Sequence, residues 1–184
     1  MLELALTHRS FSYEAGGLPT NERMEFLGDS VLGLVVTDEL YEKFPDLDES
    51  RLSPLRSGVV NMRALAQLAR DINLGQYLRI GKGEEATNGR DKNSILADSF
   101  EALVGAIYLD HGYTKTAEIV LNLLRPVIDS AQSSGAALDG KTALQELAAA
   151  NGLTSPEYEI GESGPDHDKS FTAVAILSGQ RYPQ

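Results

Sequence analysis

The chain has 184 residues, a formal net charge of −11 and no cysteine. This length allows one domain of ordinary size, or one domain with a small second unit. The lack of cysteine excludes disulfides and thiolate-bound metals. No apolar run has membrane-spanning length, and the first residues do not resemble a signal peptide. We therefore expect a soluble, cytoplasmic protein without a membrane partner.

The acidic balance argues at first against nucleic acid as a partner, because a protein that follows phosphates usually carries a basic face. A solvated acidic surface that aids solubility is the simpler interpretation. The placement of the acids along the chain decides between these two interpretations.

The first part of the chain, residues 1–129, is predicted to be a helical domain. Apolar residues recur there at helical spacing, as in Val31, Leu34 and Val35, whereas strong strand-like alternation is absent. Residues 130–140 are small and polar and include glycine, which is a composition typical of a linker.

The second unit, residues 141–184, is predicted to combine a helix with strands. The helix covers residues 141–151, and Gly152 would close it in a left-handed conformation. Two strands are expected, at 158–162 and 169–177, with a turn-rich GPDHD segment between them. A helix and two strands bury little apolar surface, so this unit is expected to be incomplete.

Three acids share one face of a helix that begins near residue 20. At about 100° per residue, Glu22, Glu25 and Asp29 fall within about 60° of one another, and Leu34 lies on the opposite, core-facing side. Phe26 lies beside the acids, and an exposed aromatic there indicates a partner surface. A solvated outer face is the alternative, and this helix alone leaves both open.

A second helix repeats the pattern, because Asp98 and Glu101 are spaced i, i+3 and share one side with Gly105. In the first helix, Gly33 continues the acidic face, although glycine in a helix costs about 1 kcal/mol relative to alanine. Close approach of another helix would explain why a glycine occupies this position. Two helices packed by these glycine faces would bring four carboxylates together: Glu25, Asp29, Asp98 and Glu101.

Clustered carboxylates repel one another unless cations lie between them. Hard oxygen ligands of this kind suit Mg²⁺ or Mn²⁺ and not zinc. Such ions activate water for phosphodiester hydrolysis. The pattern therefore predicts a Mg²⁺ site in which Mn²⁺ can substitute, with two unrelated exposed stripes as the alternative. On this interpretation, part of the net negative charge of the chain serves to bind the metal.

The segment ERMEFLGDS at residues 22–30 resembles the signature of the ribonuclease III family. The resemblance extends to LTHRS at 6–10 and to SILADSFEALVGAIY at 94–108, and it covers essentially the whole chain. The order of elements resembles bacterial members with one nuclease domain and one double-stranded-RNA-binding domain, and the detail resembles actinobacterial ones.

This resemblance implies a mainly α fold, with an all-helical nuclease domain at 1–129, a linker at 130–140 and a partial α+β RNA-binding domain at 141–184. The last strand and the last helix of the RNA-binding domain are expected to be missing. In the nuclease domain, Pro54 lies in a stretch that is continuous helix in the family, and Ser53 is predicted to cap a helix there.

The resemblance also assigns roles to the acids, position by position. Glu25, Asp98 and Glu101 match the metal ligands of the family. Asp29 matches the essential acid beside them, and Glu101 is also counted as catalytic.

Other positions match residues at the interface of a homodimer. Glu22 and Glu49 match acids that lie near the cleft across the dimer. Phe26 matches an aromatic that inserts into the partner subunit. In the second unit, the positions expected to contact RNA are Thr142, Gln145, Glu146, His167 and Lys169.

The implied function is a homodimeric, Mg²⁺-dependent endoribonuclease that hydrolyses double-stranded RNA and leaves 5′ phosphate and 3′ hydroxyl ends. Its substrates would be precursors of ribosomal and messenger RNA. The alternative is a catalytically inactive relative that binds structured RNA, which the loss of a ligand carboxylate would favour. No such position is lost. His8 and His111 are given no catalytic role.

Overall fold

The computed structural model describes residues 1–138, 140–163 and 170–182. Within these ranges, side chains are described except at 131–138, 140–143, 146, 170 and 171. The chain divides into two compact units, Met1–Ser133 and Ser134–Gln184.

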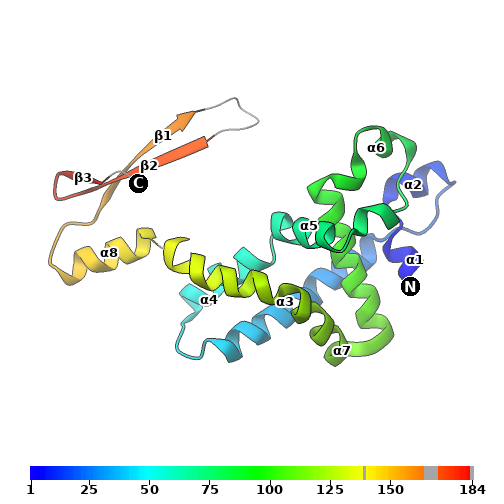
Figure 1. Cartoon of the computed structure of the whole chain (residues 1–184), viewed down its shortest axis with the longest axis horizontal. Coiled ribbons are helices and arrows are strands. Elements are labelled where there is room, and N and C mark those ends of the chain that lie inside the picture. The colour runs from blue at the N-terminus through cyan, green and yellow to red at the C-terminus, as the bar shows by residue number, and fades with distance from the viewer. Residues whose placement is uncertain (139, 164–169, 183–184) are drawn as a thin grey trace. The chain divides into compact units, whose positions relative to one another are not determined.

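The first unit is built from helices (Figure 1). In chain order these are α1 (Leu2–Ala5), α2 (Arg9–Glu14), α3 (Glu22–Lys43), α4 (Glu49–Val59), α5 (Met62–Asp71), the 3₁₀ turn η1 (Leu74–Tyr77), α6 (Lys82–Ala86), the 3₁₀ turn η2 (Gly89–Asp91) and α7 (Asn93–Leu138). The mainly helical fold predicted from the sequence is confirmed. None of the described helices combines the length and apolar character needed to span a bilayer.

The core of this unit lies between α3, α5 and α7. Its largest fully buried side chains include Leu32 from α3, Leu65 from α5, and Phe100 and Leu124 from α7. Their helical spacing lets each helix bury one apolar stripe, so the opposite faces are left for other roles.

One core assignment is wrong. Leu34 is 57% exposed, whereas Val31 and Val35 are buried as predicted. The buried stripe of α3 is centred further round the helix, and it includes Leu32 and Val36. Leu34 therefore lies outside the stripe, because the packing partners of α3 approach from the other side.

Two local predictions need correction. Residues 131–138, which were expected to belong to a linker, continue helix α7. This segment has one glycine and no proline, and extending an existing helix needs no new nucleus. Helix α4 begins at Glu49 and is capped by Asp48, whose side chain accepts from Arg51 N at 3.2 Å. Pro54 therefore lies inside the helix, and Ser53 is not its cap.

The second unit contains α8 (Gly140–Ala150) and an antiparallel sheet in the order β1 (Glu157–Ser163), β2 (Ser170–Leu177), β3 (Gln180–Tyr182). Gly152, at φ +66°, ends α8 as predicted. Leu153 N donates to Ala148 O at 2.8 Å across this cap.

The third strand corrects the prediction that the last strand is missing. Strand β3 pairs with β2 so that Gln180 lies opposite Leu177 and Tyr182 lies opposite Ala175. The residues between the two strands, at positions 178 and 179, both have positive φ, at 50° and 81°. Such a two-residue turn matches the twist of an antiparallel hairpin, so it returns the chain along β2.

Candidate metal centre and active site

Helices α3 and α7 touch backbone to backbone at two glycines. A Cβ on Gly28 would lie 1.8 Å from the carbonyl oxygen of Glu101, and one on Gly105 would lie 2.3 Å from that of Met24. Only glycine allows this approach. The expectation of a close contact at Gly33 is wrong, because a Cβ there would meet nothing within 4 Å.

The crossing brings together acids that lie far apart in the sequence. Glu25 on α3 and Asp98 and Glu101 on α7 each offer a carboxylate oxygen, and these oxygens lie within 4.8 Å of one another. All three side chains are half-buried. Behind them, buried Met24 and Ala102 pack in a small apolar cluster. We call Glu25, Asp98 and Glu101 the carboxylate cluster.

The site disfavours negative charge most strongly at Glu101. Burial raises the pKa of Glu101 to about 7, and the neighbouring charges of Asp29, Asp98 and Glu25 add to this increase. Burial removes water from the carboxylate, while the other acids repel its charge. Both effects would be relieved by a cation between the carboxylates.

The pKa values of the other two members of the cluster, Glu25 and Asp98, are raised as well. The pKa of Glu25 is raised by burial first, and then by the charges of Asp98 and Glu22. Burial also raises the pKa of Asp98, although the positive charges of His8 and Arg9 reduce that increase.

The donor set fits a hard divalent cation. It consists of oxygen ligands only, and each is a carboxylate whose charge the cation would compensate. The sequence-based prediction placed four acids together, and three of them form the cluster.

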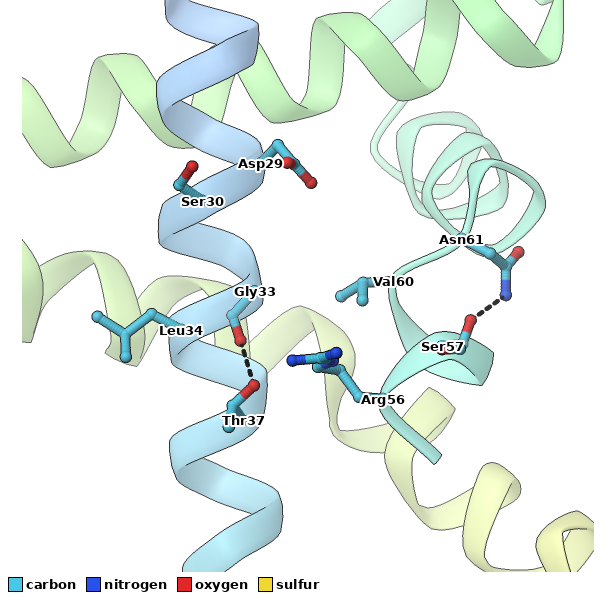
Figure 2. Close-up of a pocket in the computed structure, with 9 residues that line it drawn as sticks. All are labelled: Asp29, Ser30, Gly33, Leu34, Thr37, Arg56, Ser57, Val60 and Asn61. Carbon is cyan, nitrogen blue, oxygen red and sulfur yellow. Dashed lines mark hydrogen bonds between the residues drawn. The ribbon is translucent and has the colours of Figure 1, made fainter. Parts of the chain in front are cut away.

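The fourth acid, Asp29, lies at the edge of the site. It is exposed, and its charge acts on Glu101 and Glu25. With Arg56 and other residues it lines a hollow of about 620 Å³ between α3 and α4. Figure 2 shows Arg56 pointing from α4 toward Thr37 of α3.

The two accessory acids differ in position. Glu22 is exposed in the first turn of α3 and accepts from Thr20 Oγ1 at 2.8 Å, with Arg9 at 3.8 Å. Glu49 is exposed at the start of α4, and its charge is not among those that shift the pKa values of the cluster. Within one chain, the charge of Glu22 therefore acts on Glu25 of the cluster, whereas that of Glu49 does not.

The exposed flank of α3 is apolar in part. Phe26 is 78% exposed and Leu34 is 57% exposed. Leu34 is one of the residues that line the hollow, whereas Phe26 is not. In Figure 2, Leu34 projects from α3 away from Arg56.

The residues expected to contact RNA are placed only in part. Gln145 is exposed on α8. Thr142 and Glu146 belong to the same helix, but their side chains lie outside the described ones. His167 and Lys169 lie outside the described residues.

Sequence reasoning missed the environment of His8. Its side chain caps α2 by accepting from Ser10 N, and its charge acts on Asp98 of the cluster. A histidine directly before a short helix and two residues before a serine is a weak local sign of such a cap, but it gives no sign of the neighbouring acids.

Comparison with known protein families first defines the class of protein. Residues 1–127 match the family described as "Ribonuclease-III-like", and residues 141–184 match the "Double-stranded RNA binding motif". The fold and the site together define the class of protein. It is a helical nuclease with a carboxylate cluster, followed by a double-stranded-RNA-binding motif.

Comparison with individual relatives identifies the family within this class. The chain is 61% identical to "Ribonuclease 3" of Thermobifida fusca over 99% of its length, and 58% identical to that of Streptomyces coelicolor. It spans 76% and 66% of these relatives. A solved nuclease domain of ribonuclease III from Campylobacter jejuni is 42% identical, with a TM-score of 0.64, and covers 68% of this chain and 85% of its own. The chain belongs to the ribonuclease III family, whose actinobacterial members it resembles in sequence.

Proposed function

We propose that this chain hydrolyses double-stranded RNA with the help of Mg²⁺ held by Glu25, Asp98 and Glu101, and that Mn²⁺ can replace Mg²⁺. The observation that carries the proposal is the half-buried carboxylate cluster at the crossing of α3 and α7. Solvated acids on a surface would not need to approach so closely, nor would they be withdrawn from water.

Each acid would have a distinct task. Glu25, Asp98 and Glu101 would bind the cation, which supplies Lewis-acid polarisation of the phosphodiester and acidifies water in the site when bound. Asp29 reaches the site from its exposed edge, where it would orient water and accept its proton. Family resemblance also makes Glu101 catalytic together with Asp29, in addition to its proposed part in holding the cation.

The finer chemistry and the substrates follow from family resemblance. Cleavage would leave a 5′ phosphate on one fragment and a 3′ hydroxyl on the other. The proposed substrates are stems in precursors of ribosomal and messenger RNA, processed in the cytoplasm.

We also propose a homodimer. Phe26 and Leu34 expose apolar area on α3, and the similar Campylobacter jejuni structure concerns a region involved in dimer formation. Phe26 would insert into the partner subunit, where the hollow beside Arg56 offers a receiving surface. Glu22 and Glu49 would then lie near the cleft across the dimer.

RNA binding is proposed for the second unit. Residues 1–129 would form the nuclease domain and residues 141–184 the RNA-binding domain. Side chains of α8 would meet one minor groove, and residues 164–169 would reach the next, since such domains read A-form shape. The proposed contacts are Thr142, Gln145, Glu146, His167 and Lys169.

A direct test uses a labelled RNA duplex with the same strand single-stranded, and with the corresponding DNA duplex, as controls. Cleavage should require the RNA duplex, disappear in EDTA and return with Mg²⁺ or Mn²⁺. End-group analysis should find 5′ phosphates. Binding of the duplex without cleavage under all metal conditions would favour the inactive RNA-binding alternative and contradict the proposal.

A further inference from the structure

Arg9, the first residue of α2, lies on a stretch of backbone that is anchored on both sides. On one side, His8 N donates to Arg79 O at 3.0 Å. On the other side, Ser10 Oγ accepts from Gly81 N at 2.8 Å, and Ser10 N donates to the capping Nδ1 of His8 at 3.3 Å. The backbone of Arg9 is therefore held in place, whereas its side chain is 74% exposed.

The same stretch is fastened to the start of α3, which carries the acidic face. Asn21 N donates to Thr7 O at 2.9 Å, and both of these residues are 2% exposed. Across this contact, Arg9 Nη1 lies 3.8 Å from Glu22 Oε1. Glu22 and Glu25 are three residues apart, so they are neighbours on the helix surface with Cβ atoms about 5–6 Å apart. The guanidinium of Arg9 therefore lies beside the carboxylate cluster, separated from Glu25 by one acid.

The guanidinium of Arg9 is only loosely engaged. Its distance to Glu22 exceeds that of a hydrogen bond, and such an exposed ion pair contributes little to stability. By contrast, Arg79, Arg90 and Lys92 each donate a hydrogen bond to a carboxylate. Their side chains are 34%, 36% and 41% exposed, respectively. Arg9 thus keeps donors that can bind a ligand from solvent.

The position of this positive charge suits an incoming phosphate. An RNA strand that reaches the cluster brings negative charge toward carboxylates, in a chain whose net charge is already −11. Burial raises the pKa values of Glu25 and Asp98, and the positive charge of Arg9 counteracts this increase in both. A guanidinium also matches the geometry of a phosphate, which it binds through two parallel hydrogen bonds.

We propose that Arg9 is a phosphate-binding residue of the active site, which exchanges its loose pairing with Glu22 for a backbone phosphate of the RNA duplex near the scissile bond. This inference rests on the proposed function, because it assumes that the duplex is cleaved at the carboxylate cluster. The contact forms when RNA binds and persists during the reaction, so its loss raises KM and changes kcat little.

Substitutions in the full chain test the charge and the geometry of Arg9 separately. In Arg9→Met, duplex affinity in Ca²⁺ should fall by about 10- to 100-fold, and the slope of log affinity against log salt should decrease by about one. The Tm and the Mn²⁺ affinity should stay unchanged. Arg9→Lys, which keeps the charge but not the two parallel donors, should recover part of the affinity. Arg23→Met is the matched control, because Arg23 is exposed on α3 but lies about 160° around the helix from Glu25.

Duplexes with single neutral methylphosphonates near the cleavage position identify the phosphate itself. At the phosphate that Arg9 binds, neutralisation should weaken binding by the wild type but have little further effect on Arg9→Met. Equal losses in both proteins at every position would overturn the proposal, as would a lower Tm in Arg9→Met with an unchanged salt slope. If Arg9→Met does not fold, the same comparison with Arg9→Lys decides.

The Glu101→Gln variant separates this inference from the proposed function. Loss of cleavage in Glu101→Gln together with unchanged duplex binding in Arg9→Met would reject only the role of Arg9. Full cleavage by Glu101→Gln would reject the metal centre itself.

Discussion

Acidic residues at the crossing of α3 and α7 and on strand β1 show how position changes the chemistry of one residue type. On β1, Glu157, Glu159 and Glu162 are exposed, and Glu159 forms an ion pair with Arg181. At the crossing, the carboxylate cluster is half-buried, and Asp98 and Glu25 raise the pKa of Glu101 beyond the effect of burial. The acids of both regions contribute to the net negative charge of the chain. Only those at the crossing lie so close together that a cation is required between them.

The cause of the difference lies in the backbone. A strand exposed on both sides leaves each carboxylate in water, where a neighbouring cation contributes little. Two helices that touch at Gly28 and Gly105 exclude water from the acids beside them. Net charge alone therefore does not indicate whether a protein binds nucleic acid.

The largest effect is expected when the cluster loses a charge. Glu101→Gln should reduce RNA cleavage by on the order of 10³-fold or more, because several kcal/mol of metal-dependent stabilisation are lost and about 1.4 kcal/mol is tenfold. Duplex binding in Ca²⁺ should persist. Glu159→Gln on β1 is the control, and gel-based cleavage rates give the comparison. Full activity in Glu101→Gln would remove the assigned site.

The exposed apolar flank of α3, which includes Phe26, is expected to act in dimerisation, whereas the acidic face of the same helix is expected to bind metal. Burial of one Phe contributes about 1.5–3 kcal/mol, and a symmetric dimer buries two copies. Phe26→Ala should therefore weaken dimerisation by on the order of 10²-fold or more, as measured by sedimentation equilibrium. Tyr13→Ala, at an aromatic residue of α2 that is 89% exposed, should leave the association unchanged. A wild-type monomer at micromolar concentration would argue against the dimer.

The effect of the glycine contact on stability can be measured separately from the general effect of glycine on helix stability. Gly28→Ala forces a Cβ into the backbone of α7, and we expect a loss of about 1–3 kcal/mol or more in the free energy of unfolding. Gly33→Ala on the same helix meets nothing within 4 Å, so it should gain about 0.5–1 kcal/mol. Urea denaturation measures both. Equal effects at the two positions would show that the crossing tolerates a side chain.

The smallest expected effect is a pH dependence of stability in the metal-free protein. A glutamate carboxyl has an ordinary pKa of 4.5, and the fold raises the pKa of Glu101 to about 7. Between these values the folded chain binds more protons than the unfolded chain, so the free energy of unfolding falls as pH rises through this window. In EDTA, Glu101→Gln should lose less stability than wild type between pH 5 and pH 8. Parallel urea midpoints would contradict this sign, and Mg²⁺ should restore the wild type at pH 8.

The sequence by itself determined the features that depend on neighbouring residues along one helix or strand. The i, i+3 spacing placed Asp98 and Glu101 on one side of α7, and the spacing of Glu22, Glu25 and Asp29 gave one acidic face. The cap at Gly152 and the extent of β1 and β2 were predicted for the same reason. A serine–glycine pair between strand-like residues also favours a hairpin, so the turn at residues 178 and 179 had a local signal as well, although the third strand was not predicted.

Only the tertiary structure decided where the two helices meet. The acidic face pointed to Gly33 as the contact, yet α7 crosses α3 at Gly28, and Leu34 is left exposed in the wall of the hollow. It also joined His8 to a distant part of the chain, because His8 N donates to Arg79 O at 3.0 Å. Periodicity along a single helix fixes which residues share a face. The point and the angle at which that face meets another helix depend on the shapes of all the side chains packed between them.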